Sequence, residues 1–407
     1  ESSADVSDLD DTLAARINAA LAQGALPRSG TRRLQTGLFP ASGDDTEGAF
    51  KLNHQLNETQ SLMLRFAYTN DRRWRDALGA GSLSDFSARG DAFTRDQALV
   101  GQWLNVLNPA AVNDLRFQLA RRRVLFRPNA AAGPQILIPG ALTFGRVADA
   151  PSDRTEDHYQ LLDSVALSRH RHQWRFGAGV NHVRLDARLA ERANGFALFD
   201  SVTALLNAQP ALYTQAFGAI ETHPSVVTTG AFVQDHWQPR AGLTFDFGVR
   251  YDYEALPKPF ARAARNFSPR IGFAFSPGAS SRGVLRGAYG MYFDRYLLAF
   301  LNPALQRDGA RGFEQVLSGA AAVAAFQQAQ GGSLLAPVAG IAPSIYRADP
   351  RLRTPYSQQA NLGFERQLFS DVTLAVNYLF VKGTHLPRTR NVNLLPPAAL
   401  SGRVAFG

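Results

Sequence analysis

The stretch Gly242-Leu243-Thr244-Phe245-Asp246-Phe247-Gly248-Val249-Arg250-Tyr251-Asp252-Tyr253 alternates apolar and polar residues along its length. In an extended chain, one face carries Leu243, Phe245, Phe247, Val249, Tyr251 and Tyr253, and the other carries Thr244, Asp246, Gly248, Arg250 and Asp252. This period of two predicts a β-strand. It holds for more than ten residues, the length that a tilted strand needs to cross a lipid bilayer.

The same alternation recurs elsewhere in the chain, in Ser61–Thr69, in Val372–Lys382 and around Leu285, Tyr289, Met291 and Phe293. Large aromatic residues are predicted on the apolar face near the strand ends, as in the aromatic girdles of membrane barrels. They are Tyr251, Tyr253, Tyr289, Tyr292, Phe293 and Tyr378.

Short and long connections take turns along the chain. Tight turns rich in Asn, Pro, Gly and Ser predict six hairpins: Lys51–Leu56 with Ser61–Thr69, Ala98–Leu107 with Asp114–Phe126, Tyr159–Leu167 with Trp174–Leu185, Thr229–Trp237 with Leu243–Tyr253, Arg270–Phe275 with Val284–Phe293, and Gln359–Gln367 with Val372–Val381. Longer segments separate the hairpins: Asn70–Thr94, Arg127–Asp157, Arg188–Thr228, Ala255–Phe267 and Tyr296–Tyr356. Outer-membrane barrels have such short periplasmic turns and long outer loops.

Composition limits the class of protein. The 407 residues contain 43 Lys plus Arg against 34 Asp plus Glu, a net charge of +9, and 45% are hydrophobic. The absence of cysteine excludes disulfides, thiolate metal sites and a cysteine nucleophile. No run of apolar residues is long enough for a membrane-spanning helix, but the alternating strands of a barrel need no such run.

These patterns predict an all-β fold, a transmembrane antiparallel up-and-down β-barrel. We expect a partial barrel of about twelve long strands, with short turns on one side and long loops on the other. The alternative is a soluble β-rich binding module, a sandwich with one wet face. Long strands and repeated long loops favour the barrel, because soluble strands average about 5–6 residues.

Two segments are predicted to be helical. Asp10–Gln23 places Leu13, Ile17 and Leu21 on one stripe, and Phe313–Ala329 is rich in Ala and Gln and lacks Pro. The predicted organisation is an N-terminal loop and helical segment (residues 1–47), an outer-membrane β-barrel section (48–394) and a truncated continuation (395–407).

Five strings in order resemble the hairpins of TonB-dependent outer-membrane receptors, and more narrowly the Oar-like branch of that family. They are Lys51–Leu56 (KLNHQL), Phe232–Trp237 with Leu243–Asp252 (FVQDHW and LTFDFGVRYD), Asn266–Phe275 with Val284–Arg295, Thr354–Arg366 (TPYSQQANLGFER) and Asn377–Arg388 (NYLFVKGTHLPR). The resemblance covers about Lys51 to Leu394.

This resemblance implies the bacterial outer membrane and active import of a scarce, unidentified substrate. Ligand capture by loops and lumen wall would be followed by rearrangement of a plug energised by TonB. We find no plug, TonB box or aromatic closing strand, and the family barrels have about 22 strands, so we expect an interior barrel section with TonB acting through a missing N-terminal region. The alternative is an Oar-like adhesion or structural role without transport.

No catalytic, cofactor-binding or metal-binding residue is selected by the sequence. His170 and His172 share one face of a strand, but no third ligand is nearby and a tight turn is predicted there. No nucleophile elbow occurs, and no particular Ser and His pair at the barrel rim stands out as a lipase site. We therefore expect a protein that is not an enzyme and holds no cofactor.

Arginines are spread through the alternating strands rather than gathered on a helix, as shown by Arg65, Arg116, Arg175, Arg250 and Arg286. This distribution predicts a positively charged wet lumen, and basic contacts to lipid head groups and lipopolysaccharide at the rim, rather than nucleic-acid binding. Such a lumen would favour acidic solutes, because the guanidinium fork binds carboxylate and phosphate.

Overall fold

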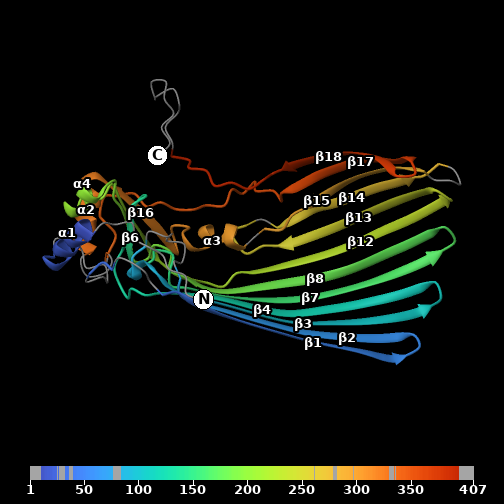
Figure 1. Cartoon of the computed structure of the whole chain (residues 1–407), viewed down its shortest axis with the longest axis horizontal. Coiled ribbons are helices and arrows are strands. Elements are labelled where there is room, and N and C mark those ends of the chain that lie inside the picture. Colours follow the sequence, from blue (N-terminus) through green and yellow to red (C-terminus); the bar gives the residue numbers. More distant parts are fainter. Residues whose placement is uncertain are drawn as a thin grey trace, which may run out of the picture.

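The architecture is that of a long curved sheet with a cluster of folded loops at one end (Figure 1). A computed structural model describes residues 11–24, 26, 33–35, 40–76, 84–260, 262–277, 282–296, 298–329, 334 and 336–393. Residues 395–407, the predicted continuation, lie outside the described residues.

Twelve long strands form an antiparallel meander, which confirms the predicted fold class and strand number. In order across the sheet they are β1 (Ser42–Asn57), β2 (Gln60–Asp76), β3 (Gly90–Asn108), β4 (Ala111–Pro128), β7 (Ser152–Arg169), β8 (His172–Leu189), β12 (Ser225–Arg240), β13 (Leu243–Ala255), β14 (Ala263–Phe275), β15 (Gly283–Phe293), β17 (Tyr356–Phe369) and β18 (Val372–Thr384). The short β11 (Glu221–Thr222) adds to the end of β8. β1 begins at Ser42, before residue 48, where the barrel section is predicted to begin.

All six predicted hairpins are present, and their strands run further than the alternation alone indicated, from 11 residues in β15 to 19 in β3. The turns within hairpins span residues 58–59, 109–110, 170–171, 241–242, 276–282 and 370–371. The connections between hairpins span 77–89, 129–151, 190–224, 256–262 and 294–355. Because the sheet is an antiparallel meander, all the connections between hairpins lie at one end of the strands, as predicted.

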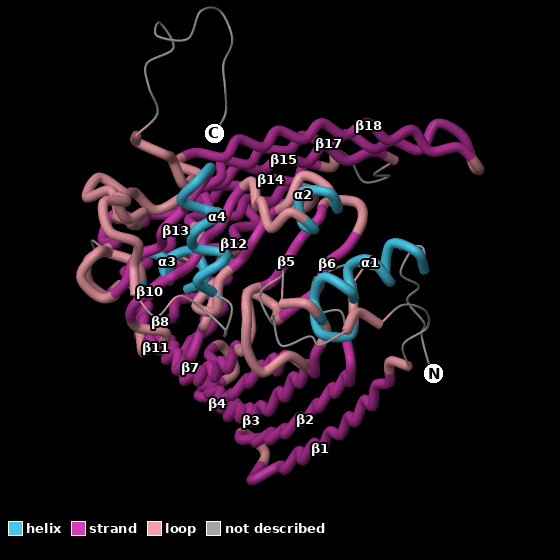
Figure 2. The backbone as a smooth tube through the Cα atoms, turned by 90° about the vertical axis from the view of Figure 1, so that its left-hand side faces the viewer, coloured by secondary structure: helices cyan, strands magenta, loops and turns pink. Residues whose placement is uncertain are grey.

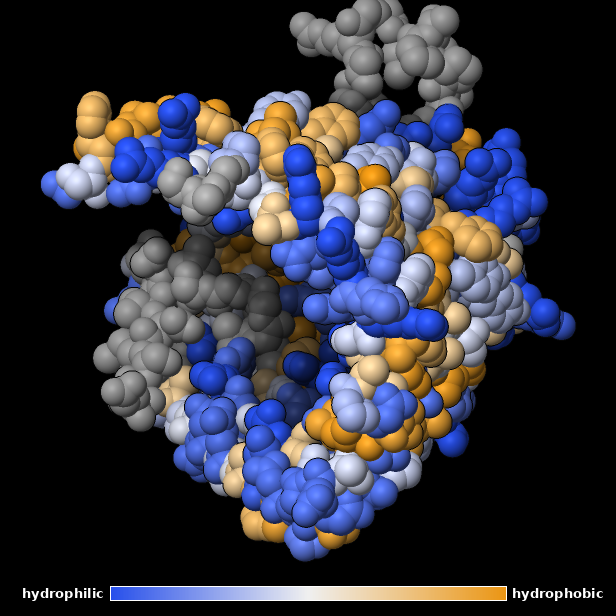
Figure 3. Space-filling model, turned by 90° about the vertical axis from the view of Figure 1, so that its right-hand side faces the viewer, coloured by the Kyte–Doolittle hydropathy of each residue, from blue (hydrophilic) through white to orange (hydrophobic). Residues whose placement is uncertain are grey.

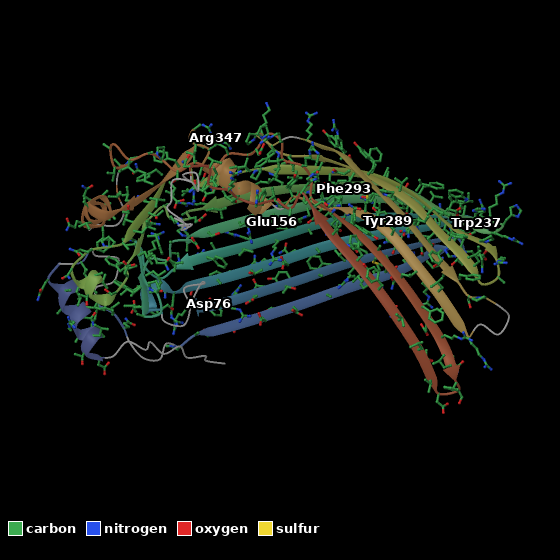
Figure 4. The ribbon with its side chains drawn as sticks, turned by 90° about the horizontal axis from the view of Figure 1, so that it is seen from above. Asp76, Glu156, Trp237, Tyr289, Phe293 and Arg347 are labelled. Carbon is green, nitrogen blue, oxygen red and sulfur yellow. The ribbon has the colours of Figure 1, made fainter. Side chains whose placement is uncertain are left out.

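The sheet curves but does not close within the described residues. There, β1 pairs only with β2, and β18 pairs only with β17. Figure 2 shows the strands as an arc, and Figure 4 shows β17 and β18 diverging from the direction of β1 to β4. The arc therefore has a concave side and a convex side, and its two edges lie apart.

The long connections fold together into a second sheet of five strands at their end of the molecule. Its order is β16 (Gly312–Ser318), β10 (Leu212–Gly218), β9 (Phe196–Leu198), β5 (Gln135–Ile138) and β6 (Leu142–Gly145), with β5 and β9 parallel. These strands come from three different connections. We call this sheet, with helices α1 (Asp11–Ala22), α2 (Val202–Leu206) and α4 (Gly319–Gln328), the loop cap. It lies on the concave side of the arc (Figure 2).

The loop cap has the main hydrophobic core of the described residues. Helix α1 confirms the prediction for Asp10–Gln23, of which Asp10 lies outside the described residues, and it buries Ile17 and Leu21. Phe199 and Phe326 pack edge to face with ring centroids 5.1 Å apart. The core joins segments distant in sequence, because Ile17, Ile136, Phe199, Leu317 and Phe326 belong to one cluster.

The predicted helix Phe313–Ala329 is correct only in its second half. Residues 319–328 form α4, but Gly312–Ser318 forms strand β16, which pairs with β10 in the register Phe217 with Phe313. Tertiary pairing with β10 overrides the local helical preference of these residues. The remaining helices are α3 (Leu298–Gln306) and the single turn η1 (Phe86–Ala88). Among the helices described, none is long and apolar enough to cross a membrane.

Candidate functional site

The two faces of the long sheet differ in chemistry. Directly paired residues share a face, so the register places Phe66, Leu99, Leu119 and Tyr159 in one row across four strands. Large apolar side chains exposed on this convex face include Leu64, Phe66, Phe117, Leu119, Tyr159, Leu161, Phe176, Val180, Phe247, Val249 and Ile271. Figure 3 shows hydrophobic residues on the outer surface and many hydrophilic residues bordering the hollow. This arrangement suits hydrocarbon outside and water inside.

Most of the predicted aromatic positions lie on the convex face, but two details of the prediction are wrong. Tyr292 lies on the concave face, because it pairs with Ser357 while its neighbours Met291 and Phe293 share the opposite face. Tyr289 and Tyr378 are convex but lie halfway along β15 and β18 rather than near strand ends. A prediction from alternation places a residue on the correct face only where that residue is in phase with its strand.

An aromatic stack lies on the convex face at the turn end, near Trp237 in Figure 4. Ring centroids of Trp174, His172, Trp237, Phe245 and Phe247 follow one another at 5.9, 5.7, 5.7 and 5.9 Å. His172 Nδ1 lies 2.6 Å from Asp235 Oδ2. The other histidine of the pair considered above, His170, occupies the turn with φ 55°. Neither belongs to a group of three or more potential metal ligands among the described residues.

The five arginines selected from the sequence share the concave face. Arg250 pairs with Ser268 and Phe232, on the face opposite to Val249, and Arg286 pairs with Ala274 and Gly363. Arg116 and Arg175 reach Asp114 and Ser164 on the same face, and Arg65 alternates with the convex Leu64 and Phe66. The structure thus brings these arginines to one wall, as the wet-lumen prediction requires.

A pocket of about 360 Å³ opens in this concave wall at β7, β8 and β12–β15. We call it the lumen pocket. Its polar lining includes Arg250, Asp252, Glu254, Asn266, Arg270 and Asp294. Three of these are acids and two are arginines, and Arg295 also lines the pocket, so the two signs of charge are balanced there. The pocket has the volume of a small-molecule site, since such sites are about 300–1,000 Å³.

In the lining of the lumen pocket, Arg250 and Asp252 form a two-point ion pair. Arg250 Nε lies 2.7 Å from Asp252 Oδ2, and Nη2 lies 2.6 Å from Oδ1. Gly230 pairs directly with Asp252, and a Cβ atom there would lie 2.4 Å from Asp252 Oδ1. The glycine therefore makes the room that the ion pair occupies.

Next to this pair, Arg270 stacks on Tyr292. The guanidinium carbon lies 4.5 Å from the ring centroid, which is cation–π geometry. Gly290 faces Arg270 across the strands, and a Cβ atom there would lie 2.8 Å from the Tyr292 hydroxyl. A second glycine thus lets an aromatic ring lie flat on the lumen wall, where it presents a planar, amphipathic surface.

A small apolar cluster begins next to the pocket lining, since Tyr296 follows Arg295 in the chain; it consists of Phe260, Tyr296, Leu301, Ala304 and Leu305. Burial raises the pKa of Tyr296 to about 12, and the nearby charge of Glu254 adds to the rise. The phenol therefore stays protonated at neutral pH. Tyr296 and α3 connect the lumen pocket to the loop cap.

Within the loop cap, a buried ionic network joins two connections. Glu314 Oε2 accepts from Arg307 Nη1 at 2.9 Å, and Glu314 Oε1 accepts from Arg192 Nη1 at 2.5 Å. Arg307 also lies 3.1 Å from Glu191. Because Arg307 and Glu314 are almost fully buried, removing one partner would leave an uncompensated charge.

Sequence reasoning did not find the lumen pocket or the cap. The sequence singles out Arg250, but it does not indicate that Asp252, Arg270 and Tyr292 lie close together. Their proximity depends on the register in which β13, β14 and β15 pair. For the cap, the short apolar run Ile136–Ile138 within β5 was available as a signal. It is too short to be distinguished from the long connection in which it lies.

The sequence profile of one family, described as outer membrane beta barrel domain, matches residues 8–264 and 257–405. No curated protein matches the chain.

Several solved structures share the fold. The outer membrane transporter YddB from Escherichia coli has a TM-score of 0.56 and 13% identity over 86% of this chain and 41% of its own. A variant of the ferric enterobactin receptor from Pseudomonas aeruginosa has a TM-score of 0.55 and 12% identity over 86% of this chain and 43% of its own. A structure of the FpvAI–pyocin S2 complex has a TM-score of 0.51 and 9% identity. The chain thus spans less than half the length of these proteins.

Proposed function

Because this chain belongs to the family of outer-membrane β-barrel domains, we propose that it is the substrate-binding wall of a TonB-dependent receptor that imports a solute. The chain is a protein of the bacterial outer membrane, and the soluble binding module is excluded. Import, the Oar-like branch and energy transfer from TonB to a plug are parts of the proposal.

One observation carries the proposal: the lumen pocket includes Glu254 and Asp294, which lie at the loop ends of β13 and β15. The loop cap lies at this end, on the same concave side (Figure 2). A solute arriving from outside would meet the cap first and then the charged wall. The similarity in fold to an outer membrane transporter, YddB, and to a ferric enterobactin receptor supports a role in transport.

The proposed division of the chain follows from this role. The barrel section begins with β1 at Ser42 rather than at residue 48, and we propose that it extends to residue 394. We propose a binding role rather than a catalytic one, because Arg250 and Asp252 in the lumen pocket are held in an ion pair with each other.

A growth competition tests import. A strain of the source bacterium without the full-length gene would compete with its parent in media that each limit one nutrient. Import predicts a defect in at least one medium, reproduced by loss of TonB and repaired by the restored gene. Undiminished growth in every medium together with lost surface attachment would instead establish the adhesion role and overturn import.

A further inference from the structure

A basic patch lies on the convex face, beyond the apolar band and toward the loop end. The row Leu119–Tyr159 of the apolar band is followed two residues further by Arg121, Asp157 and Arg184, which pair across β4, β7 and β8. Four residues beyond the Leu119–Tyr159 row, in the same direction, Arg123 and Asp186 lie near the connections between hairpins. The patch consists of six arginines and the five acids that the register places beside them: Arg72, Arg95, Arg121, Arg123, Arg184, Arg188, Asp44, Asp153, Asp157, Asp186 and Glu221.

Two of the arginines are held in place by aspartates. Arg121 reaches both oxygens of Asp157 at 2.6 and 3.0 Å, and Arg123 reaches both oxygens of Asp153 at 3.0 and 2.7 Å. These pairs tie β4 to β7. The patch keeps an excess of one positive charge, six arginines less five acids.

The other four arginines lie on the flanking strands β2, β3 and β8. Arg72, Arg95, Arg184 and Arg188 have exposed side chains, and none of the four forms an ion pair within 4.0 Å among the described residues. Among the residues that the structure describes, Arg95 donates to the neutral Asn70, at 3.4 Å. Structural pairing therefore accounts for two of the six arginines and leaves four available to a ligand.

The position of the patch selects the ligand. Long loops of outer-membrane barrels face the outside, so the patch lies level with the head groups of the outer leaflet, which consists of phosphorylated glycolipid. Rows four residues apart span about 13 Å, and five strands span about 19 Å. That area can meet more than one phosphate, and the guanidinium fork binds phosphate at two points.

We propose that this convex patch on β2, β3, β4, β7 and β8 binds the phosphate groups of lipopolysaccharide, with Arg184 and Arg188 as the main free contacts. The proposal rests on the outer-membrane location and not on import.

The test measures binding of purified full-length protein in detergent to lipopolysaccharide by titration calorimetry. The variant is Arg184→Gln with Arg188→Gln, because neither arginine has an ion-pair partner that would be orphaned. We expect about a fivefold loss of affinity for each arginine, hence roughly 25-fold together. Lipopolysaccharide stripped of its phosphates should bind the unchanged protein at least as weakly as intact lipopolysaccharide binds the variant, because the variant keeps Arg72 and Arg95.

The matched control is Arg65→Gln with Arg116→Gln, which removes the same charge from the concave face and should keep the affinity. Slower gel mobility after heating checks that every variant is folded, and Arg184→Lys with Arg188→Lys serves if the Gln variant is not. Equal loss in patch and control variants would overturn the proposal. So would equal binding of stripped lipopolysaccharide, or equal patch-dependent binding of phosphatidylglycerol vesicles or of inorganic phosphate.

Discussion

Arg250 and Asp252, two residues apart on β13, hold each other by two short contacts in the space left by Gly230 on β12. Both charged side chains therefore lie flat against the concave wall, half-buried, with their positions set by a residue on another strand. The lumen pocket is a product of strand register as much as of the residues that line it.

Replacing Gly230 with Ala should displace this ion pair without unfolding the sheet. The new Cβ atom would stand 2.4 Å from Asp252 Oδ1 and 2.6 Å from Arg250 Nη2, and both are ends of side chains that can move. A structure of the Gly230→Ala variant should show the β12–β13 register unchanged and the ion pair broken. Gly48→Ala is the control, because a Cβ atom at Gly48 meets nothing within 4 Å. An intact ion pair in the Gly230 variant would contradict this account.

Neutralising Arg250 and Arg286 together should weaken uptake of anionic solutes, because both lie on the concave wall. Arg250→Gln with Arg286→Gln is expected to lower the uptake rate of an anionic solute several-fold and leave a neutral solute of equal size unchanged. Radiolabelled uptake into cells measures both. Arg184→Gln with Arg188→Gln makes the same charge change on the convex face. Unchanged anion uptake in the lumen variant would count against an electropositive lumen.

A charge on the convex face should destabilise the protein in lipid. Val249 lies at the middle of β13 and is exposed on the apolar face, so Val249→Lys should lower the free energy of unfolding by about 2–4 kcal/mol. Urea titration of the full-length protein in lipid vesicles measures this. Gln234→Lys, on the concave face of the neighbouring strand, should change it little. Equal stability of the two variants would be inconsistent with hydrocarbon outside.

Removing the charge of Glu314 should loosen the loop cap and spare the long sheet. Glu314→Gln leaves Arg192 and Arg307 facing each other without their shared partner, and breaking a buried pair costs about 3–5 kcal/mol. Hydrogen exchange should become faster in β10 and β16 but not in β3 or β4. The control Asp349→Asn breaks an exposed pair with Arg351 and should change nothing. Unaltered exchange in β16 would show that the network does not hold the cap.

Much of the long sheet could be predicted from the sequence because its signal is local. Residues in a strand alternate between two faces whatever the partner, so Leu243–Tyr253 already separates its apolar residues from Thr244, Asp246 and Arg250. The turns carry their own chemistry, which is why all six hairpins were identifiable. The error at Tyr292 has the same origin, because a single residue out of phase gives no local warning.

The loop cap and the lumen pocket depend on contacts that no local pattern contains. Residues 313–318 have helical neighbours and become a strand only because β10, about a hundred residues earlier, offers a pairing edge. Asp252, Arg270 and Tyr292 come from three strands whose register brings them to one wall. Alternation is visible within each strand alone. The pairing partners of a strand depend instead on burial and hydrogen bonding in the whole fold.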